Sequence, residues 1–337
     1  MSATLSPADA LAAAGGPLTL PEIERAHTIL ADKVVCTPSV SWVGSDLLSA
    51  LAPGTRVTAK LELFQKTGSF KARAALLNVL GLSDQQRARG ITAISAGNHA
   101  IAAAYAASEA GVSAKVVMIA TANPRRVELA KRYGAEVVMA EDAHAGFELV
   151  DRIAADEGRA LIHPFEGRTT AMGTATLGLE LMRQVPDLDA VIVPIGGGGL
   201  CAGVSSAVKA INPACRVFGV EPEGADSMTR SFAAGSPQGI DAVRTIADSL
   251  GAPYALPIGF ELCRRNVDRL VLVTDSALRD AMRMTLLDMK LAVEPAGAAA
   301  LAALAGPLRD ELAGAHVGLI VCGANIDVAS YARLIGD

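Results

Sequence analysis

The segment FQKTGSFKAR (64–73) places a single lysine, Lys71, where polar turn residues give way to a run of alanine and leucine. This pattern predicts the first turn of a helix, where the helix dipole disfavours a positive charge. Burial at the same place would favour the neutral amine, which is a nucleophile. The alternative is a solvated surface lysine without a role. Other parts of the sequence must decide between the two.

A glycine-rich loop is the second stretch that suggests chemistry. It consists of Gly196, Gly197, Gly198 and Gly199. It joins a predicted strand to a predicted helix, so its backbone N–H groups are unscreened by side chains and lie at a helix N-terminus. Such a loop suits a phosphate group. A tight turn needed only for packing is the alternative.

The same loop also allows a different class of protein. Gly197, Gly199 and Ala202 satisfy a relaxed G-x-G-x-x-A pattern, and Glu221 ends the next predicted strand. A nicotinamide-binding fold places its ribose-binding acid at a similar position. On this stretch alone an NAD-dependent dehydrogenase stays open. However, the loop lies past the midpoint of the chain, whereas a simple dehydrogenase would begin with this unit.

The elements that would position these residues alternate along the chain. Strands are predicted at 91–95, 114–120, 136–140, 160–164, 190–196 and 216–222, and helices at 100–111, 124–135, 145–158, 172–185 and after the glycines. Helices at 276–290 and 294–304 and a strand and turn at 316–325 follow. Short strands rich in Val and Ile, each followed by a helix, indicate parallel sheets covered on both faces.

Composition narrows the class of protein. The 337 residues are 51% apolar and carry a net charge of −5 without a basic run, which disfavours a disordered chain and a nucleic-acid partner. The five cysteines form no CxxC pair, which indicates a reducing compartment. No apolar run has the length of a membrane span, and the N-terminus lacks the basic residues of a signal peptide. We therefore expect a soluble, cytoplasmic protein.

Seven motifs together resemble one family. They are KLELFQKTGSFKAR (60–73), SAGNHA (95–100), HPF (163–165), GGGG (196–199), VEP (220–222), EPAGA (294–298) and CGAN (322–325). In this order the chain resembles the pyridoxal-phosphate (PLP) enzymes of the tryptophan-synthase-β fold, fold type II. The similar branch contains threonine and serine dehydratases and serine racemases. The resemblance extends from about residue 20 to the C-terminus.

The resemblance implies an α/β fold with two domains, parallel-rich twisted sheets flanked by helices, and PLP between the domains. We expect an N-terminal tail at 1–20, a large PLP-binding domain at 21–89 plus 166–337, and a small domain at 90–165. Enzymes of this branch also suggest a homodimer that acts on a small amino acid.

The resemblance also assigns roles. It implies that Lys71 is the catalytic residue and holds the cofactor covalently, that the glycine loop binds its phosphate, and that Phe70 packs against its ring. The implied cofactor-binding residues are Phe70, Lys71, Asn98, Gly196, Gly197, Gly198, Gly199, Glu294 and Cys322. The implied substrate-binding residues are Ser95, Asn98 and His99, at a strand-to-helix turn suited to a carboxylate.

Two residues bear on the reaction. Cys322 matches the position that meets the pyridine nitrogen, and a thiol there makes the ring a weaker electron sink, which suits elimination. A small buried hydrophobe is its alternative reading. Racemases of this branch carry a serine where this chain has Ala96, and inversion needs acid–base groups on both faces of the substrate. We therefore expect β-elimination from a 3-hydroxy amino acid, such as L-threonine or L-serine, to a 2-oxo acid and ammonia.

The substrate itself stays open at this point. A dehydratase of 3-hydroxyaspartate or of a bulkier 3-hydroxy amino acid, and a serine racemase, are alternatives. Arg168 could be a turn residue or could face the substrate. The branch also suggests a Mg²⁺ or Ca²⁺ ion, for which Glu221 and the carbonyl of Ala225 match two ligands, but Ser227 stands where a carboxylate is usual.

Overall fold

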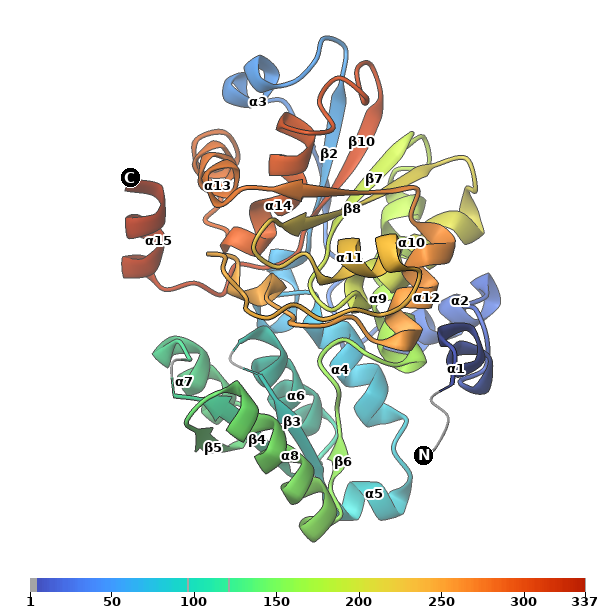
Figure 1. Cartoon of the computed structure of the whole chain (residues 1–337), viewed down its shortest axis with the longest axis vertical. Helices are drawn as coiled ribbons and strands as arrows, with labels where there is room; N and C mark the ends of the chain where they lie inside the picture. The colour runs from blue at the N-terminus through green and yellow to red at the C-terminus, as the bar shows by residue number, and fades with distance from the viewer. Residues whose placement is uncertain (1–4, 96, 121, 337) are drawn as a thin grey trace.

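The computed structural model describes residues 5–95, 97–120 and 122–336, which form two sheets (Figure 1). The six-stranded sheet has the order β1-β2-β10-β7-β8-β9, and the four-stranded sheet has the order β5-β4-β3-β6. All neighbouring strands are parallel except β1 and β2. The strands are β1 (Ser39–Trp42), β2 (Arg56–Leu61), β3 (Ile91–Ile94), β4 (Ala114–Ile119), β5 (Glu136–Ala140), β6 (Ala160–Leu161), β7 (Ala190–Pro194), β8 (Arg216–Pro222), β9 (Arg269–Val273) and β10 (His316–Val321).

Helices cover both sheets. They are α1 (Pro7–Ala13), α2 (Leu20–Leu30), α3 (Ser45–Ala50), α4 (Lys71–Leu80), α5 (Asp84–Arg89), α6 (Asn98–Glu109), α7 (Pro124–Arg132), α8 (Ala143–Glu157), α9 (Arg168–Gln184), α10 (Gly199–Ile211), α11 (Ser227–Ala234), α12 (Pro257–Asn266), α13 (Asp275–Met289), α14 (Pro295–Ala305) and α15 (Val328–Gly336). Short 3₁₀ turns are η1 (Glu62–Phe64), η2 (Lys66–Gly68) and η3 (Asp248–Leu250). In the described ranges no helix combines the length and apolar character needed to cross a bilayer.

The expected fold class is confirmed: the chain is an α/β protein with parallel-rich sheets. The four-stranded sheet takes all its strands from 91–161, and the six-stranded sheet takes its strands from both sides of that segment. Figure 1 shows the larger sheet in the upper part of the molecule and the smaller sheet in the lower part, with α4 at their junction. We call these parts the large half and the small half. The domain bounds set from the sequence stay a prediction.

The ends of several elements differ from the sequence prediction, by one to four residues. The strand expected at 160–164 is only two residues long, and the helix expected from residue 172 begins at Arg168. Near the N-terminus, α1 lies within the segment expected as a tail, and its Leu11 is buried against the core. Arg168 pairs with Glu22 of α2 at 2.8 Å and donates to the carbonyl of Gly16, so it holds the N-terminal segment. It does not line the cavity that lies between the two halves.

A buried ionic cluster fixes α4 to the large half. Arg73 donates to both oxygens of Glu62, at 2.8 and 2.9 Å, and to both oxygens of Glu180, at 2.8 Å. Lys60 of β2 donates to Glu180 at 2.9 Å. The exposed fraction of all four side chains is 3% or less. Burial alone would disfavour these charges, and the four paired hydrogen bonds of Arg73 offset that cost.

Removing the centre of this cluster should destabilise the protein strongly. Arg73→Ala leaves the buried carboxylate of Glu62 without its cation and leaves that of Glu180 with Lys60 alone, so we expect a loss of roughly 3–5 kcal/mol in the free energy of unfolding. Urea denaturation monitored by circular dichroism measures it. The control is Arg125→Ala, which breaks an exposed pair with Glu128 and should cost less than about 1 kcal/mol. Similar losses for both variants would contradict this account of the cluster.

Candidate active site

A cavity of about 580 Å³ lies between the two halves. The residues predicted to bind cofactor and substrate all line it: Phe70, Lys71, Ser95, Asn98, His99, Gly196, Gly197, Gly198, Gly199, Glu294 and Cys322. They come from five separate parts of the chain. The fold therefore gathers into one cavity the residues that the motifs singled out. Ala96 lies outside the described residues.

Lys71 is the first residue of α4, as the sequence predicts. Its Nζ donates a hydrogen bond to the carbonyl of Pro164 and lies 5.1 Å from the centre of the Phe70 ring. Burial lowers the pKa of this amine to about 8, and the neighbouring groups Cys322 and Glu294 act in the opposite direction. A substantial fraction of the amine is thus neutral near pH 8, which gives it the character of a nucleophile and a base.

The glycine loop is closed in on several sides. A Cβ on Gly197 would lie 2.2 Å from the ring of Phe165, and one on Gly199 would lie 2.4 Å from the Phe165 carbonyl oxygen. Gly198 has a φ of +97°, in the region that favours glycine. From behind, Thr174 of α9 donates its hydroxyl to the carbonyl of Gly199 at 2.7 Å. Only glycines fit here, and α10 begins at the loop with its N-terminus.

The N-terminus of α6 faces the same cavity. Asn98 donates to Glu294 at 2.7 Å and accepts from the amide of Asn325 at 2.7 Å. The His99 ring makes a 2.8 Å hydrogen bond with the carbonyl of Ile162, and because a carbonyl only accepts, Nε2 carries the proton. Burial, helped by the charge of Lys71, lowers the pKa of His99 to about 3. His99 is therefore a neutral positioning group rather than a cationic one.

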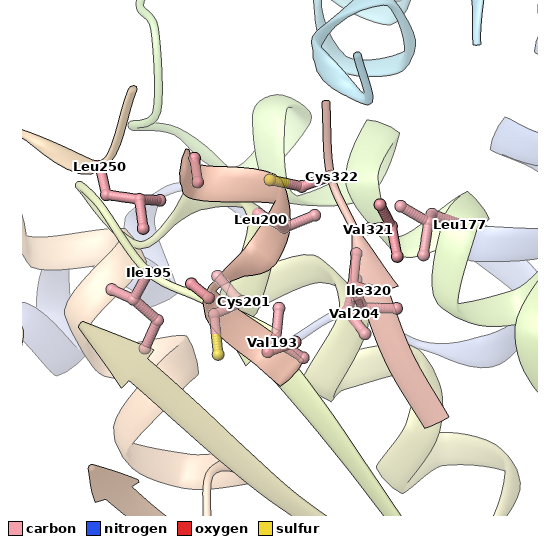
Figure 2. Packing of buried hydrophobic residues seen from close by; sticks show 14 of the residues in the cluster. Leu177, Val193, Ile195, Leu200, Cys201, Val204, Leu250, Ile320, Val321 and Cys322 are labelled. Atoms are coloured by element: carbon pink, nitrogen blue, oxygen red, sulfur yellow. The ribbon is translucent and has the colours of Figure 1, made fainter. Parts of the chain in front are cut away.

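Two acidic groups from the large half complete the cavity. Glu294 precedes α14 and is buried, and burial raises the pKa of its carboxyl. Cys322 directly follows β10, and burial raises the pKa of its thiol well above the ordinary value. Figure 2 shows Cys322 after Val321, in the buried cluster that also contains Leu200 of α10. A protonated thiol is therefore the form that faces the cavity.

Sequence reasoning missed a cation in this site. Arg126 of α7 donates to Asp248 at 2.6 and 3.3 Å and to the carbonyl of Asn325 at 2.9 Å, and its guanidinium lies 3.7 Å from Glu294. Arg126 belongs to the small half and all three partners to the large half, so it bridges the two across one end of the cavity. A signal was present, since a second arginine in the first turn of a helix is as disfavoured by the dipole as Lys71 is.

The expected metal ligands have other partners in the structure. One oxygen of Glu221 accepts from the N–H of Met228 at 2.8 Å, and the other accepts from the N–H and hydroxyl of Thr229 at 2.7 and 2.6 Å. The carboxylate thus caps the start of α11. Over the described parts of the chain, no three His, Cys, Asp or Glu side chains gather in a way that could hold a metal ion.

Comparison with known proteins places the chain in a family. Residues 44–323 match the family described as "Pyridoxal-phosphate dependent enzyme". A phenylserine dehydratase of Ralstonia pickettii is 58% identical over 284 residues, 84% of this chain and 87% of that protein. An L-threonine ammonia-lyase of Thermotoga maritima is 35% identical over 319 residues, 94% of this chain and 78% of that protein. The solved structure of maize serine racemase has a TM-score of 0.88 at 36% identity, covering 94% of this chain and 96% of that one.

The chain therefore belongs to the family of pyridoxal-phosphate dependent enzymes, in the branch of threonine and serine dehydratases and serine racemases. The cavity fits this cofactor. A buried amine with a lowered pKa suits an aldehyde, a loop that only glycines can form suits a phosphate, and the thiol of Cys322 suits a ring nitrogen. This family assignment replaces the alternative that the chain is an NAD-dependent dehydrogenase.

The lowered pKa of Lys71 gives a pH dependence that can be measured on the protein freed of cofactor. Below pH 8 the amine is mainly protonated and cannot attack an aldehyde. The rate of PLP uptake should therefore rise by about tenfold per pH unit up to roughly pH 7.5 and level off above pH 8. The growth of visible absorbance after addition of PLP measures this rate. A rate that keeps rising to pH 10 would show an ordinary lysine.

Proposed function

We propose that the protein removes water and then ammonia from a 3-hydroxy amino acid with a large apolar group on Cβ, and so releases a 2-oxo acid. One observation carries the reaction type: Lys71, with its lowered pKa, lines the same cavity as the glycine loop and the N-terminus of α6. The similarity to a phenylserine dehydratase and to an L-threonine ammonia-lyase supports the same reaction.

When bound, PLP supplies an electron sink for the electrons of the bond broken at Cα. Lys71 Nζ accepts the proton from Cα, because its pKa of about 8 makes the amine available as a base near neutral pH. The hydroxyl on Cβ then departs as water, and protonated Lys71 gives it the proton that it needs. Since Lys71 both holds the cofactor and moves the proton, no second base is needed.

The small half binds the other end of the substrate. The N–H groups at the start of α6 and the hydroxyl of Ser95 would bind the carboxylate, which the dipole of a 12-residue helix favours. Asn98 is held by Glu294 and Asn325, so its amide is available in one orientation only. His99, neutral and bonded to Ile162, holds the turn in place.

The lining of the cavity favours an apolar substituent on Cβ. Its apolar side chains include Ile94, Ile119, Phe147, Val243 and Leu250. A 3-hydroxyaspartate needs a cation for its second carboxylate. Among the described lining residues the only lysine and arginine are Lys71 and Arg126, and Arg126 already pairs with Asp248 and Glu294. The larger apolar substrates therefore fit better.

Three further proposals concern the surroundings of the reaction. We propose that the protein is a cytoplasmic homodimer, as its branch suggests, and analytical ultracentrifugation tests the dimer.

A divalent cation at Glu221 and the Ala225 carbonyl also stays a proposal. It would have to displace the hydrogen bonds from Met228 and Thr229. A shift in melting temperature on adding Mg²⁺ or Ca²⁺ after EDTA treatment tests the cation.

Lys71→Ala tests the central claim. The variant should lose the visible absorbance of the covalently held cofactor, and release of 2-oxo acid should fall by roughly 10³-fold or more, because both the anchor and the base are gone. A coupled assay of 2-oxo acid over a panel of serine, threonine, 3-hydroxyaspartate and 3-phenylserine measures it. Lys66→Ala is the matched control, since Lys66 is exposed five residues away. An active, coloured Lys71→Ala variant would disprove the assignment.

Elimination should greatly exceed racemisation. Ala96 cannot carry a proton, so the face of the substrate opposite Lys71 lacks the donor that racemases of the branch use. Incubation with a single enantiomer, followed on a chiral column, should give 2-oxo acid with little of the opposite enantiomer. Ala96→Ser should raise racemisation relative to elimination. Fast inversion by the unmodified protein would mean that another side chain serves the far face.

A further inference from the structure

A row of aromatic rings runs from the glycine loop to the small half. The rings of Phe165 and Tyr254 have centres 6.1 Å apart, and the rings of Tyr254 and Phe147 have centres 6.4 Å apart. His163 stands edge-on against Phe165 at 4.7 Å. Phe165 and Phe147, the two ends of this row, both line the cavity. We call the three rings of Phe165, Tyr254 and Phe147 the aromatic row.

The row begins beside the reacting groups. Phe165 directly follows Pro164, whose carbonyl accepts the hydrogen bond of Lys71, and its ring covers Gly197 so closely that no Cβ fits there. The row ends on α8 at Phe147. The preceding residue, Gly146, packs against Ile94, since a Cβ there would lie 2.8 Å from the Ile94 side chain. Phe147 therefore occupies a fixed place on the small half.

The segment 241–253 closes the cavity between two different contacts. Within the segment, Asp248 pairs with Arg126 of the small half. Directly after the segment, Tyr254 contacts Phe147 of the small half. Within the segment, Val243 packs against Gly251 and lines the cavity. The cavity thus has a charged end at Arg126 and an apolar end at Phe147.

The side chain of Phe147 is only partly packed into the hydrophobic core. It lies at the edge of the small cluster formed by Ile94, Val117, Ala140, Val150 and Ile153, and it is only partly buried there. Leu149 on the same helix packs against the same cluster but does not line the cavity. A large apolar side chain that is half-buried and faces a cavity has surface left to bury against a ligand.

We propose that Phe147 is the residue that selects substrates with an aromatic ring on Cβ. The ring of the substrate extends from the reacting carbons along the aromatic row and packs against Phe147, with Val243 of the closing segment on the other side. A methyl group or hydrogen on Cβ leaves this space unfilled. The inference rests on the proposed dehydratase function and adds the residue that sets its substrate preference.

The test compares Phe147→Ala with the unmodified holoenzyme. Loss of the ring contact should lower the ratio of kcat/KM for 3-phenylserine to kcat/KM for threonine by roughly 10- to 100-fold. Phe147→Leu, which keeps an apolar side chain but no ring, should give an intermediate ratio. The inhibition constants of L-phenylalanine and L-alanine give a second ratio that involves no elimination, and it should shift in the same direction.

Leu149→Ala is the matched control, because it truncates an apolar side chain of the same helix and cluster outside the cavity. It should leave both ratios within about threefold of the unmodified enzyme. Melting temperatures and visible absorbance show whether each variant is folded and loaded. An unchanged ratio in Phe147→Ala, or an equal change in Leu149→Ala, overturns the inference while the dehydratase function stands. Rejection of 3-phenylserine by an otherwise active unmodified enzyme also overturns it. Failure to convert any 3-hydroxy amino acid would refute the proposed function itself.

Discussion

The ion pairs of Arg73 determine where Lys71 can be. The two residues are two positions apart on α4, and since each helical residue turns by about 100°, they point to nearly opposite sides. Arg73 is fixed to Glu62 and Glu180 in the interior of the large half, so Lys71 must face the other way, into the cavity. The buried amine of Lys71 therefore lies on a helix whose opposite side is anchored by the ion pairs of Arg73 with Glu62 and Glu180.

Close helix packing connects this lysine to the glycine loop. A Cβ on Gly173 of α9 would lie 2.6 Å from the Ala74 Cα of α4, and a Cβ on Gly203 of α10 would lie 2.2 Å from the Ala171 carbonyl oxygen. Helices α4, α9 and α10 therefore approach to backbone contact. Because Thr174 on α9 also holds the loop through the Gly199 carbonyl, a shift of α9 would move the lysine and the loop together. The segment GTAT (173–176) supplies the glycine that this contact needs.

The sequence predicted the site best where the functional residues lie next to each other along the chain. Lys71 and the glycine loop could be identified because turn residues, glycines and helix starts leave local signals. The alternating strands and helices predicted parallel sheets, but β1, β2 and β9 were not among the predicted strands. Phe147 and Asp248 leave no such signal. Phe147 is one apolar residue in an ordinary amphipathic helix, and Asp248 lies in an irregular segment. Both acquire a role only when the small half packs against residues 241–253, more than ninety positions away from Phe147.

This division gives the two halves different tasks. Lys71 and the glycine loop are held by the ionic cluster and the close helix contacts of the large half, none of which involves α8. The residue at the apolar end of the cavity is held by α8 and the small cluster around Ile94. A change of side chain on α8 can therefore alter the space offered to the substrate without disturbing α4. Lys71 and the glycine loop, which carry out the reaction, and Phe147, which contacts the substituent on Cβ, thus belong to separately packed parts of the chain. The fold can therefore keep one reaction while the accepted substituent varies.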